Sequence, residues 1–348
     1  MENKDTRIIS TEIVFRGHPD KVCDQISAAI LKECVKQDKN TRAGIEVVGG
    51  KGIIFVTGEL TTRAKIDVKK IVRRVLKDVG YRTNYKIINN IGKQSPDINQ
   101  GVDRKDGEIC AGDNGIMYGY ACSDTPEFLP VAQVILQKFA QTYDELRKEY
   151  PQEFYSDGKA QITGVFDSSM HLLKIKTFTI CYQNSEKNRI KTDAIIKTIA
   201  TSIANQYDIE IEEFLINPTG KFLIGGFDGD SGLTGRKIVV DAYQAFAPVG
   251  GGNCNGKCPS KVDFSGTHKA RELAKRLCKN GGYRWVLVQL SYAIGVAEPV
   301  SIHIDTSSGP KSVPKSWYKE CTPNNIIKDL DLYNVDYEEL AKFGHFVD

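Results

Sequence analysis

Residues 44–57 read GIEVVGGKGIIFVT, and this stretch decides the fold class. Two short apolar runs, 44–48 and 53–57, flank a glycine-rich turn, which is the pattern of a β-hairpin. Residues 66–79 follow, and their apolar positions recur at helical spacing: Ile71, Val72, Val75, Leu76 and Val79. The stretch therefore predicts a hairpin followed by a helix.

Two later segments have the same order of elements. Residues 161–166 and 172–181 predict a second hairpin, with a helix over 192–204. Residues 285–292 and 300–304 predict the strands of a third unit, with a short helix near 325–332. We therefore expect an α/β protein of the α+β type with three similar hairpin-plus-helix units. No residue-level repeat accompanies them, and such units are common in α+β proteins, so internal triplication is only one of two interpretations.

The composition excludes several classes of protein. A chain of 348 residues permits two or three domains, and a net charge of +3 gives no ground for nucleic-acid or membrane binding. Nine cysteines are scattered along the chain, which fits reduced thiols in the cytosol. The first ten residues contain two acidic residues and no long apolar run. We therefore expect a cytoplasmic protein with no membrane or nucleic-acid partner.

The segment RGHPDK at 16–21 precedes apolar residues at helical spacing. Pro19 suits the first turn of a helix, so His18, Asp20 and Lys21 are expected at a helix N-terminus. Free N–H groups and the helix dipole favour anions there, so the histidine and the lysine could bind phosphate and Asp20 could hold magnesium. The alternative is a capped helix start with solvated charges, and the motif by itself favours that alternative.

The segment GGNCNGK at 251–257 matches the letters of a P-loop. A P-loop also needs Ser or Thr after the lysine and a helix directly behind it, whereas Cys258 and Pro259 follow here. A glycine-rich anion-binding loop with Lys257 and Lys261 remains possible, as does a mobile surface loop. The spacing of Cys254 and Cys258 argues against zinc.

The segment GGFDGDSGLTGRK at 225–237 lacks the spacing of an EF-hand. Arg236 and Lys237 precede an apolar run at 238–240, which predicts a basic pair at the entry of a strand. The pair is either solvated or a phosphate clamp. Together, these loops indicate a soluble enzyme that acts on a polyphosphate with a divalent metal, and they do not name the reaction.

Taken in order, the segments resemble the methionine adenosyltransferase (S-adenosylmethionine synthetase) family from about residue 10 to 346. The matching motifs are GHPDKVCDQIS at 17–27, GKQSPDINQGVD at 92–103, AGDNG at 111–115, NPTG at 217–220, DSGLTGRK at 230–237, GGGNCNGKCPSKVD at 250–263 and SYAIGVAEP at 291–299.

The resemblance implies a role for each matching position. The catalytic, triphosphate-binding set is His18, Lys159, Arg236, Lys237, Lys257 and Lys261. ATP contacts are His18, Asp157, Lys159, Phe222, Asp230, Arg236, Lys237 and Lys257. Methionine contacts are Glu59, Gln94, Asp113, Asp230 and Lys261. Asp20 and Asp263 match the ligands of two magnesium ions in each site, and Glu46 matches the potassium site.

The resemblance also implies the reaction and the assembly. Methionine sulfur would attack C5′ of ATP, and the released triphosphate would be cleaved to phosphate and pyrophosphate. The fold would be three units about a pseudo-threefold axis, interleaved, at about 1–103, 104–226 and 227–348. A homodimer or a dimer of dimers would share its active sites. A catalytically silent regulatory member is the alternative, and a P-loop kinase is a more distant one.

Several residues depart from the family pattern. Arg16 stands where the family usually has glutamate, and Cys110, Asn114 and Lys221 are further exchanges. Cys254 and Cys258 lie among glycines and lysines, so we expect a flexible, electropositive loop whose thiols react with electrophiles, and modification of either thiol should slow catalysis. The alternative is that both thiols are buried and inert, or point into solvent away from the phosphates. Residues 94–115 are long and polar and are expected to form a lid over the substrates.

Overall fold

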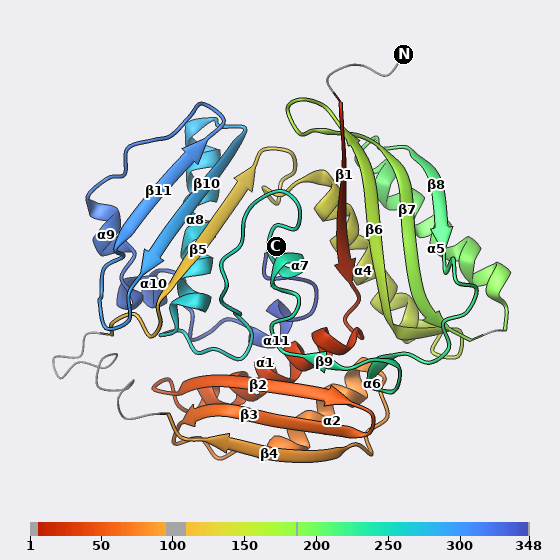
Figure 1. Ribbon diagram of the computed structural model, residues 1–348, viewed down its shortest axis with the longest axis horizontal. Coiled ribbons are helices and arrows are strands. Elements are labelled where there is room, and N and C mark those ends of the chain that lie inside the picture. The colour runs from red at the N-terminus through yellow and green to blue at the C-terminus, as the bar shows by residue number, and fades with distance from the viewer. Residues whose placement is uncertain (1–5, 95–108, 186, 347–348) are drawn as a thin grey trace.

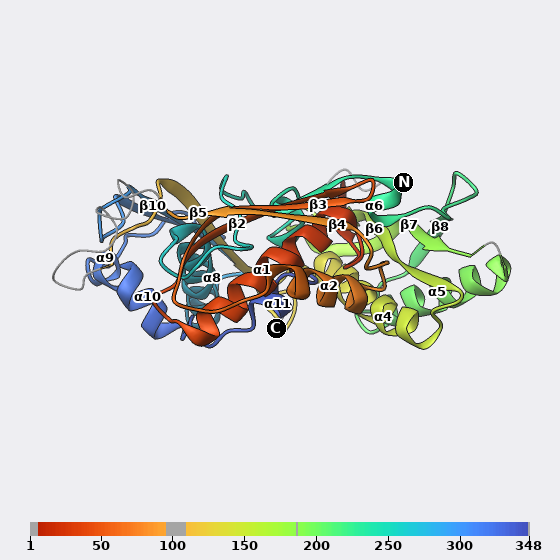
Figure 2. The ribbon, with the colours of Figure 1, turned by 90° about the horizontal axis from the view of Figure 1, so that it is seen from below.

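The computed structural model describes residues 6–94, 109–185 and 187–346. Three β-sheets surround the centre of the molecule (Figure 1). Seen from the side, the sheets form one layer and the long helices form the other (Figure 2). The mixed α+β architecture with three sheet-and-helix units, expected from the sequence, is confirmed.

The first sheet contains the hairpin predicted from residues 44–57. Its strands, in spatial order, are β4 (Lys86–Gly92), β3 (Ile53–Thr61), β2 (Arg42–Gly50) and β9 (Gly232–Leu233). Helices α1 (Pro19–Gln37) and α2 (Val68–Val79) pack beneath it. The predicted apolar stripe of α2 is buried, Asp67 accepts a capping bond from the Lys70 amide, and Gly80 ends the helix at a φ of 87°.

The second sheet is built on the predicted hairpin at 161–181, whose strands are longer than expected. Its strands, in spatial order, are β1 (Arg7–Val14), β6 (Phe154–Phe166), β7 (Leu172–Asn184) and β8 (Ile211–Ile216). Helices α4 (Val131–Glu149) and α5 (Arg189–Asn205) cover its inner face. The helix predicted over 192–204 is thus confirmed as part of α5.

The third sheet corrects one sequence expectation. Its strands, in spatial order, are β11 (Ser301–Thr306), β10 (Trp285–Tyr292) and β5 (Gly115–Cys122). The helix predicted near 325–332 exists as α10 (Pro323–Asp329), beside the short helices α9 (Ser316–Glu320) and α11 (Tyr337–Leu340). The principal covering helix, however, is α8 (Val262–Gly281), which the sequence analysis missed.

Each sheet takes one strand from a distant part of the chain. β1 pairs with β6, β5 pairs with β10, and β9 pairs with β2. Two short helices, α6 (Gly226–Gly229) and α7 (Ile238–Asp241), flank β9. α7 replaces the strand expected at 238–240. This interleaving brings the start of α1 and the segment that contains β9 and α7 side by side.

The outer face of the sheet layer carries predicted site residues. On β2, Ile45 and Val47 are fully buried toward the helices, so Glu46 points to the opposite face. The same alternation directs Glu59 of β3 and Lys159 of β6 outward. None of the helices in the described ranges combines the length and the apolarity needed to cross a membrane.

Candidate active site

His18 is the N-cap of α1, and Pro19 occupies the first helical position as predicted. The Nδ1 atom of His18 accepts a hydrogen bond from the Asp20 amide at 3.2 Å, which leaves Nε2 to carry the proton. Burial and the nearby charge of Lys237 lower the pKa of His18 to about 3. The imidazole is therefore neutral at pH 7 and serves as a hydrogen-bond donor through Nε2.

Asp20 is the centre of a charged cluster at the same helix end. Its Oδ1 accepts the Leu233 amide at 2.9 Å, and its Oδ2 lies 2.5 Å from Lys237 Nζ. Arg236 Nε lies 3.6 Å from Oδ1. Burial opposes ionisation, but the hydrogen bonds from Lys237 and Leu233 outweigh it and lower the pKa of Asp20. An ionised carboxylate thus lies beside two cations.

Strand β6 adds the central part of this cluster. Lys159 and Asp230 are close enough to influence the charge of both His18 and Asp157. Asp157 accepts the Gly226 amide at 2.7 Å, and burial raises the pKa of Asp157 to about 6 despite that bond. After the role that the resemblance implies for most of them, we call these residues the phosphate-side cluster: His18, Asp20, Asp157, Lys159, Asp230, Arg236 and Lys237. Phe222 is half-buried near the end of β7, where its carbonyl accepts the Asn184 amide at 3.0 Å.

A second group forms around α8 and the first sheet. Lys261 Nζ lies 2.8 Å from Glu59 Oε1, and Gln94 Nε2 donates to the same oxygen at 3.5 Å. Burial opposes the charge of Lys261, but the bond to Glu59 outweighs it and raises the pKa of the lysine. Asp113 is close enough to act in the same direction.

The remaining members are Lys257, Asp263 and Glu46. Lys257 Nζ is hydrogen-bonded to Asp263 Oδ2. Burial raises the pKa of Glu46, and the charge of Lys257 opposes that rise. After the role that the resemblance implies for four of them, we call these residues the methionine-side cluster: Glu46, Glu59, Gln94, Asp113, Lys257, Lys261 and Asp263. Across the described ranges, no hydrogen bond or ion pair joins the two clusters.

Lys21 fits neither interpretation of the motif at 16–21, because it is neither free to bind phosphate nor solvated. Its side chain is only 1% exposed, and its ammonium is bound between Asp24 and Asp241. The sequence analysis missed both carboxylates. An acid one helical turn after Asp20, on the face that α1 buries, was the available signal for Asp24, whereas nothing local marked Asp241.

Arg16, which departs from the family pattern, connects three helices. The guanidinium is buried and donates to Gln25 at 3.0 Å, to Asp144 at 3.3 Å and to Asp78. These partners lie on α1, α4 and α2, so the arginine links the helices beneath two sheets. Among the other departures, Asn114 Oδ1 accepts the Ile294 amide at 2.7 Å.

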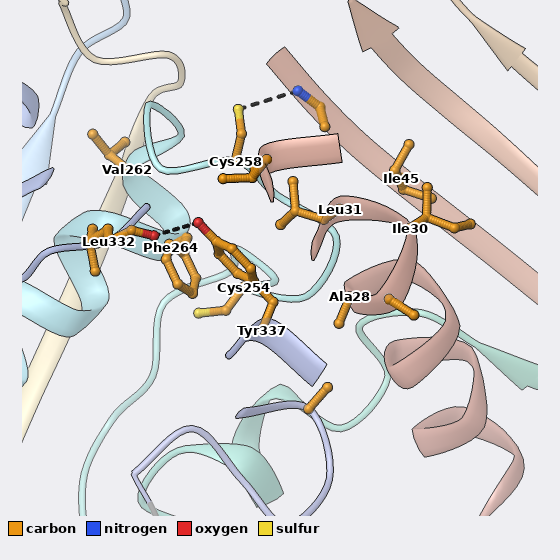
Figure 3. Close-up of a cluster of buried hydrophobic side chains, with 14 of the residues drawn as sticks. Ala28, Ile30, Leu31, Ile45, Cys254, Cys258, Val262, Phe264, Leu332 and Tyr337 are labelled. Carbon is orange, nitrogen blue, oxygen red and sulfur yellow. Dashed lines mark hydrogen bonds between the residues drawn. The ribbon is translucent and has the colours of Figure 1, made fainter. Parts of the chain in front are cut away.

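The expectation of a reactive, flexible cysteine loop is wrong. Cys258 is fully buried, and its Sγ accepts the Ala43 amide at 3.2 Å (Figure 3). Cys254 is 5% exposed and donates to the Asp263 carbonyl at 3.2 Å, while burial raises its pKa to about 12. Both thiols pack among apolar side chains of α1, α8 and α11, so they are core residues. The local glycines and lysines did not reveal this packing.

Residues 251–257 lack the setting of a P-loop. The residues before Lys257 form no strand, and Lys257 makes an isolated bridge to Gly44. Helix α8 begins four residues after Cys258 instead of at the lysine. Of the predicted lid, residues 95–108 lie outside the described residues, whereas Gln94 and Asp113 belong to the methionine-side cluster.

Comparison with known proteins assigns the family. Models of the S-adenosylmethionine synthetase N-terminal, central and C-terminal domains match residues 6–96, 108–222 and 224–348. The S-adenosylmethionine synthase of Helicobacter hepaticus is 41% identical over 99% of this chain and 93% of its own length. The proteins of that name from Helicobacter pylori strain J99 and Nitratiruptor sp. are 40% and 42% identical, over 99% and 97% of this chain and 94% and 92% of their own lengths. The chain belongs to the S-adenosylmethionine synthetase family.

Proposed function

We propose that the chain is a methionine adenosyltransferase that makes S-adenosylmethionine from ATP and methionine. Methionine sulfur attacks C5′ of ATP, and the displaced triphosphate is then hydrolysed to phosphate and pyrophosphate. One observation carries the proposal, namely the convergence of Lys159, Arg236, Lys237 and the neutral His18 beside Asp20. Such a cluster stabilises a polyanionic leaving group.

The chemistry explains why the site needs cations and does not need a general base. A thioether is a neutral nucleophile with no proton to lose, so the enzyme must align sulfur, C5′ and the leaving oxygen. The transition state then gathers negative charge on the triphosphate, and preorganised donors in a dry site lower its energy. His18 would donate a hydrogen bond from Nε2–H to that charge, without transferring the proton, while Lys159, Arg236 and Lys237 hold the phosphates.

The carboxylates present fit magnesium. Mg²⁺ is usually held by one or two carboxylates together with substrate phosphates, and Asp20 and Asp263 each offer one carboxylate beside a phosphate-binding lysine. When bound, the metal supplies charge neutralisation for the departing triphosphate and for its hydrolysis. Lys237 and Lys257, which now pair with these carboxylates, would then be released to bind phosphate. Glu46, a half-buried carboxylate, would contribute to a potassium site.

The methionine-side cluster suits an amino acid with both charges. The ammonium of Lys261 would bind the substrate carboxylate, and Glu59 with Asp113 would bind the substrate ammonium. Asp230 of the phosphate-side cluster would complete this pocket. Gln94 would fix the orientation of Glu59, to which it already donates.

A homodimer with shared sites accounts for the separation of the two clusters. Glu46, Glu59 and Lys159 point outward from the sheet layer, so two such layers placed face to face would bring opposite clusters together. The outer face also exposes Val48, Ile53 and Ile116 at 41%, 44% and 45%. Exposed apolar side chains on such a face favour burial against a second copy.

Product analysis of the purified chain with ATP, methionine, magnesium and potassium tests the function. We expect S-adenosylmethionine, phosphate and pyrophosphate in equal amounts. ADP as the product would indicate a kinase, and ATP binding without turnover would indicate the silent regulatory alternative. The presence of every matched phosphate-binding cation argues against that alternative.

A further inference from the structure

Three buried charged residues beneath the phosphate-side cluster have no role in the proposed reaction. Lys21, Asp24 and Asp241 are 1%, 0% and 2% exposed. Lys21 Nζ lies 2.9 and 2.8 Å from the two carboxylate oxygens of Asp241 and 3.3 Å from Asp24 Oδ2. One lysine therefore joins two carboxylates from separate parts of the chain.

The segment from residue 232 to 241 is fastened to α1 at successive points. The Leu233 amide donates to Asp20 and the Gly235 amide donates to Asp24, each at 2.9 Å. Gly232 lies so close to α1 that a Cβ there would be 2.2 Å from the Pro19 carbonyl oxygen. The ion pair between Lys21 and Asp241 is the last contact between the segment and α1. Arg236 and Lys237 lie between the second point and the last.

The other side of the segment is also held. The Thr234 amide donates to the Val47 carbonyl at 3.0 Å, and the Val47 amide donates to Thr234 Oγ1 at 2.8 Å. The Asp241 carbonyl accepts the His345 amide at 2.9 Å. Residues 232–241 are thus fixed between strand β2, helix α1 and the end of the described chain.

Net stability does not explain this arrangement. A buried ion pair gains little over apolar residues of the same size, because desolvation offsets much of the attraction. The pair instead fixes the position of residue 241 relative to α1, since each hydrogen bond allows only a narrow range of distance and direction. Displacing a catalytic group by about 1 Å can slow a reaction about 100-fold.

We propose that Lys21, Asp24 and Asp241 are positioning residues that set Arg236 and Lys237 against His18 and Asp20. This inference rests on the proposed function, because it assigns the network to triphosphate binding. The three side chains are buried, so the effect of the network passes through the backbone of residues 232–241. Methionine binding should be independent of it, since the methionine-side cluster shares no hydrogen bond or ion pair with these three residues in the described ranges and Asp230 lies outside residues 232–241.

The chain offers a matched control for a buried lysine. Lys269 of α8 is 2% exposed and pairs with Glu272, Glu320 and Asp329 at 3.1, 2.8 and 3.5 Å. Lys21→Met and Lys269→Met therefore make the same chemical change in two buried ion networks. We would measure steady-state kinetics of both variants with inorganic tripolyphosphate, and of synthesis at varied methionine. The comparison distinguishes a loss of activity caused by displaced catalytic residues from one caused by lower stability of the fold.

Lys21→Met should lower kcat/KM for tripolyphosphate about 100-fold and leave the KM for methionine within about twofold of the parent. Lys269→Met should leave both within about twofold of the parent, because its network lies outside both clusters. Equal losses in the two variants, or an unchanged Lys21→Met, would overturn the proposal. If Lys21→Met does not fold, Asp24→Asn, which keeps the shape of the side chain, is judged by the same measures.

Hydrogen exchange gives a second readout that does not depend on activity. The Leu233 and Gly235 amides should lose protection in Lys21→Met or Asp24→Asn and keep it in Lys269→Met. Unchanged protection of these two amides would overturn the positioning role. If the parent chain does not cleave tripolyphosphate, the proposed function fails, and the exchange pattern alone then decides whether the network holds the segment.

Discussion

The phosphate-side cluster and the methionine-side cluster are built in different ways. The first gathers its charges at one helix end, where Asp20 is 1% exposed and accepts hydrogen bonds from the Leu233 amide and from Lys237. The second consists of separate ion pairs, and in Lys261–Glu59 the two side chains are 12% and 24% exposed. The carboxylate at the centre of the first cluster is therefore fixed by donors of its own chain, whereas the Lys261–Glu59 pair of the second is partly exposed to solvent.

This difference indicates where ligands and a second subunit act. A preorganised cluster can stabilise a developing charge without moving, which is what a leaving triphosphate requires. An open pair of lysine and carboxylate is suited to exchange its internal bond for bonds to an amino acid. We therefore expect a substitution of Lys237 to affect both the synthesis and the hydrolysis steps, and a substitution of Glu59 to affect methionine binding.

The largest effect is expected from Lys237→Met. Loss of a cation beside Asp20 should reduce both synthesis and tripolyphosphate hydrolysis by about 10²–10³-fold. Lys174→Met removes a lysine that also pairs with a carboxylate, Glu212, on the exposed part of the second sheet. That control should keep parental rates, and a Lys237→Met variant as active as the control would remove Lys237 from the site.

Asp157→Asn should stabilise the fold while weakening ATP binding. The pKa of Asp157 is raised to about 6 from the usual 3.8, so between these values the folded chain retains a proton that the unfolded chain has released. The free energy of unfolding therefore falls as pH rises from 3.8 to about 6, and above that pH the full destabilisation by the buried carboxylate is present. Replacing the carboxylate should raise the free energy of unfolding by on the order of 2 kcal/mol at pH 7 and by almost nothing below about pH 4.

Denaturant unfolding of parent and Asp157→Asn at a series of pH values measures this gain. A difference that does not depend on pH would contradict the raised pKa.

Glu59→Gln should act on methionine alone. Glu59 would bind the methionine ammonium, so loss of its charge should raise the KM for methionine about tenfold. Lys261 keeps its charge, so tripolyphosphate hydrolysis should stay within about twofold of the parent. Glu212→Gln, at an exposed carboxylate that also pairs with a lysine, is the matched control. A parallel loss of hydrolysis in Glu59→Gln would show that the clusters do not divide the reaction in this way.

The smallest effect concerns the cysteine beside the methionine-side cluster. Cys258→Ala leaves the buried Ala43 amide without its acceptor, whereas Cys34→Ala removes a buried sulfur from α1 that makes no such bond. The first should therefore cost about 1 kcal/mol more stability than the second. Urea denaturation of both variants measures the difference, and equal losses would mean that the bond to Cys258 contributes nothing.

The sequence predicted the elements better than their assembly. Periodicity located the hairpins at 44–57 and 161–181 and the helix α2, because each has local apolar spacing. It missed α8, since the loop before it and its many charged residues hide the apolar stripe. Strand β9 has only two residues, and its pairing with β2 depends on contacts far apart in the sequence, which local patterns do not contain.

The candidate site shows the same limit. The start of α1 could be placed from Pro19 and the motif around it, and the resemblance supplied roles for positions such as Lys159 and Asp263. Neither predicted that Lys21 turns inward to Asp241, because the two lie 220 residues apart. The burial of Cys254 and Cys258 was likewise decided by neighbours on other helices.

The most direct test concerns the division of one active site between two chains. Lys237→Met and Asp263→Asn each disable one cluster, and hybrids can be isolated by co-expressing the two variants with different affinity tags. In a dimer with shared sites, each hybrid contains one intact site and one doubly altered site, so about half of the parental activity should return. Hybrids as inactive as the two variants alone would show that both clusters serve a site within a single chain.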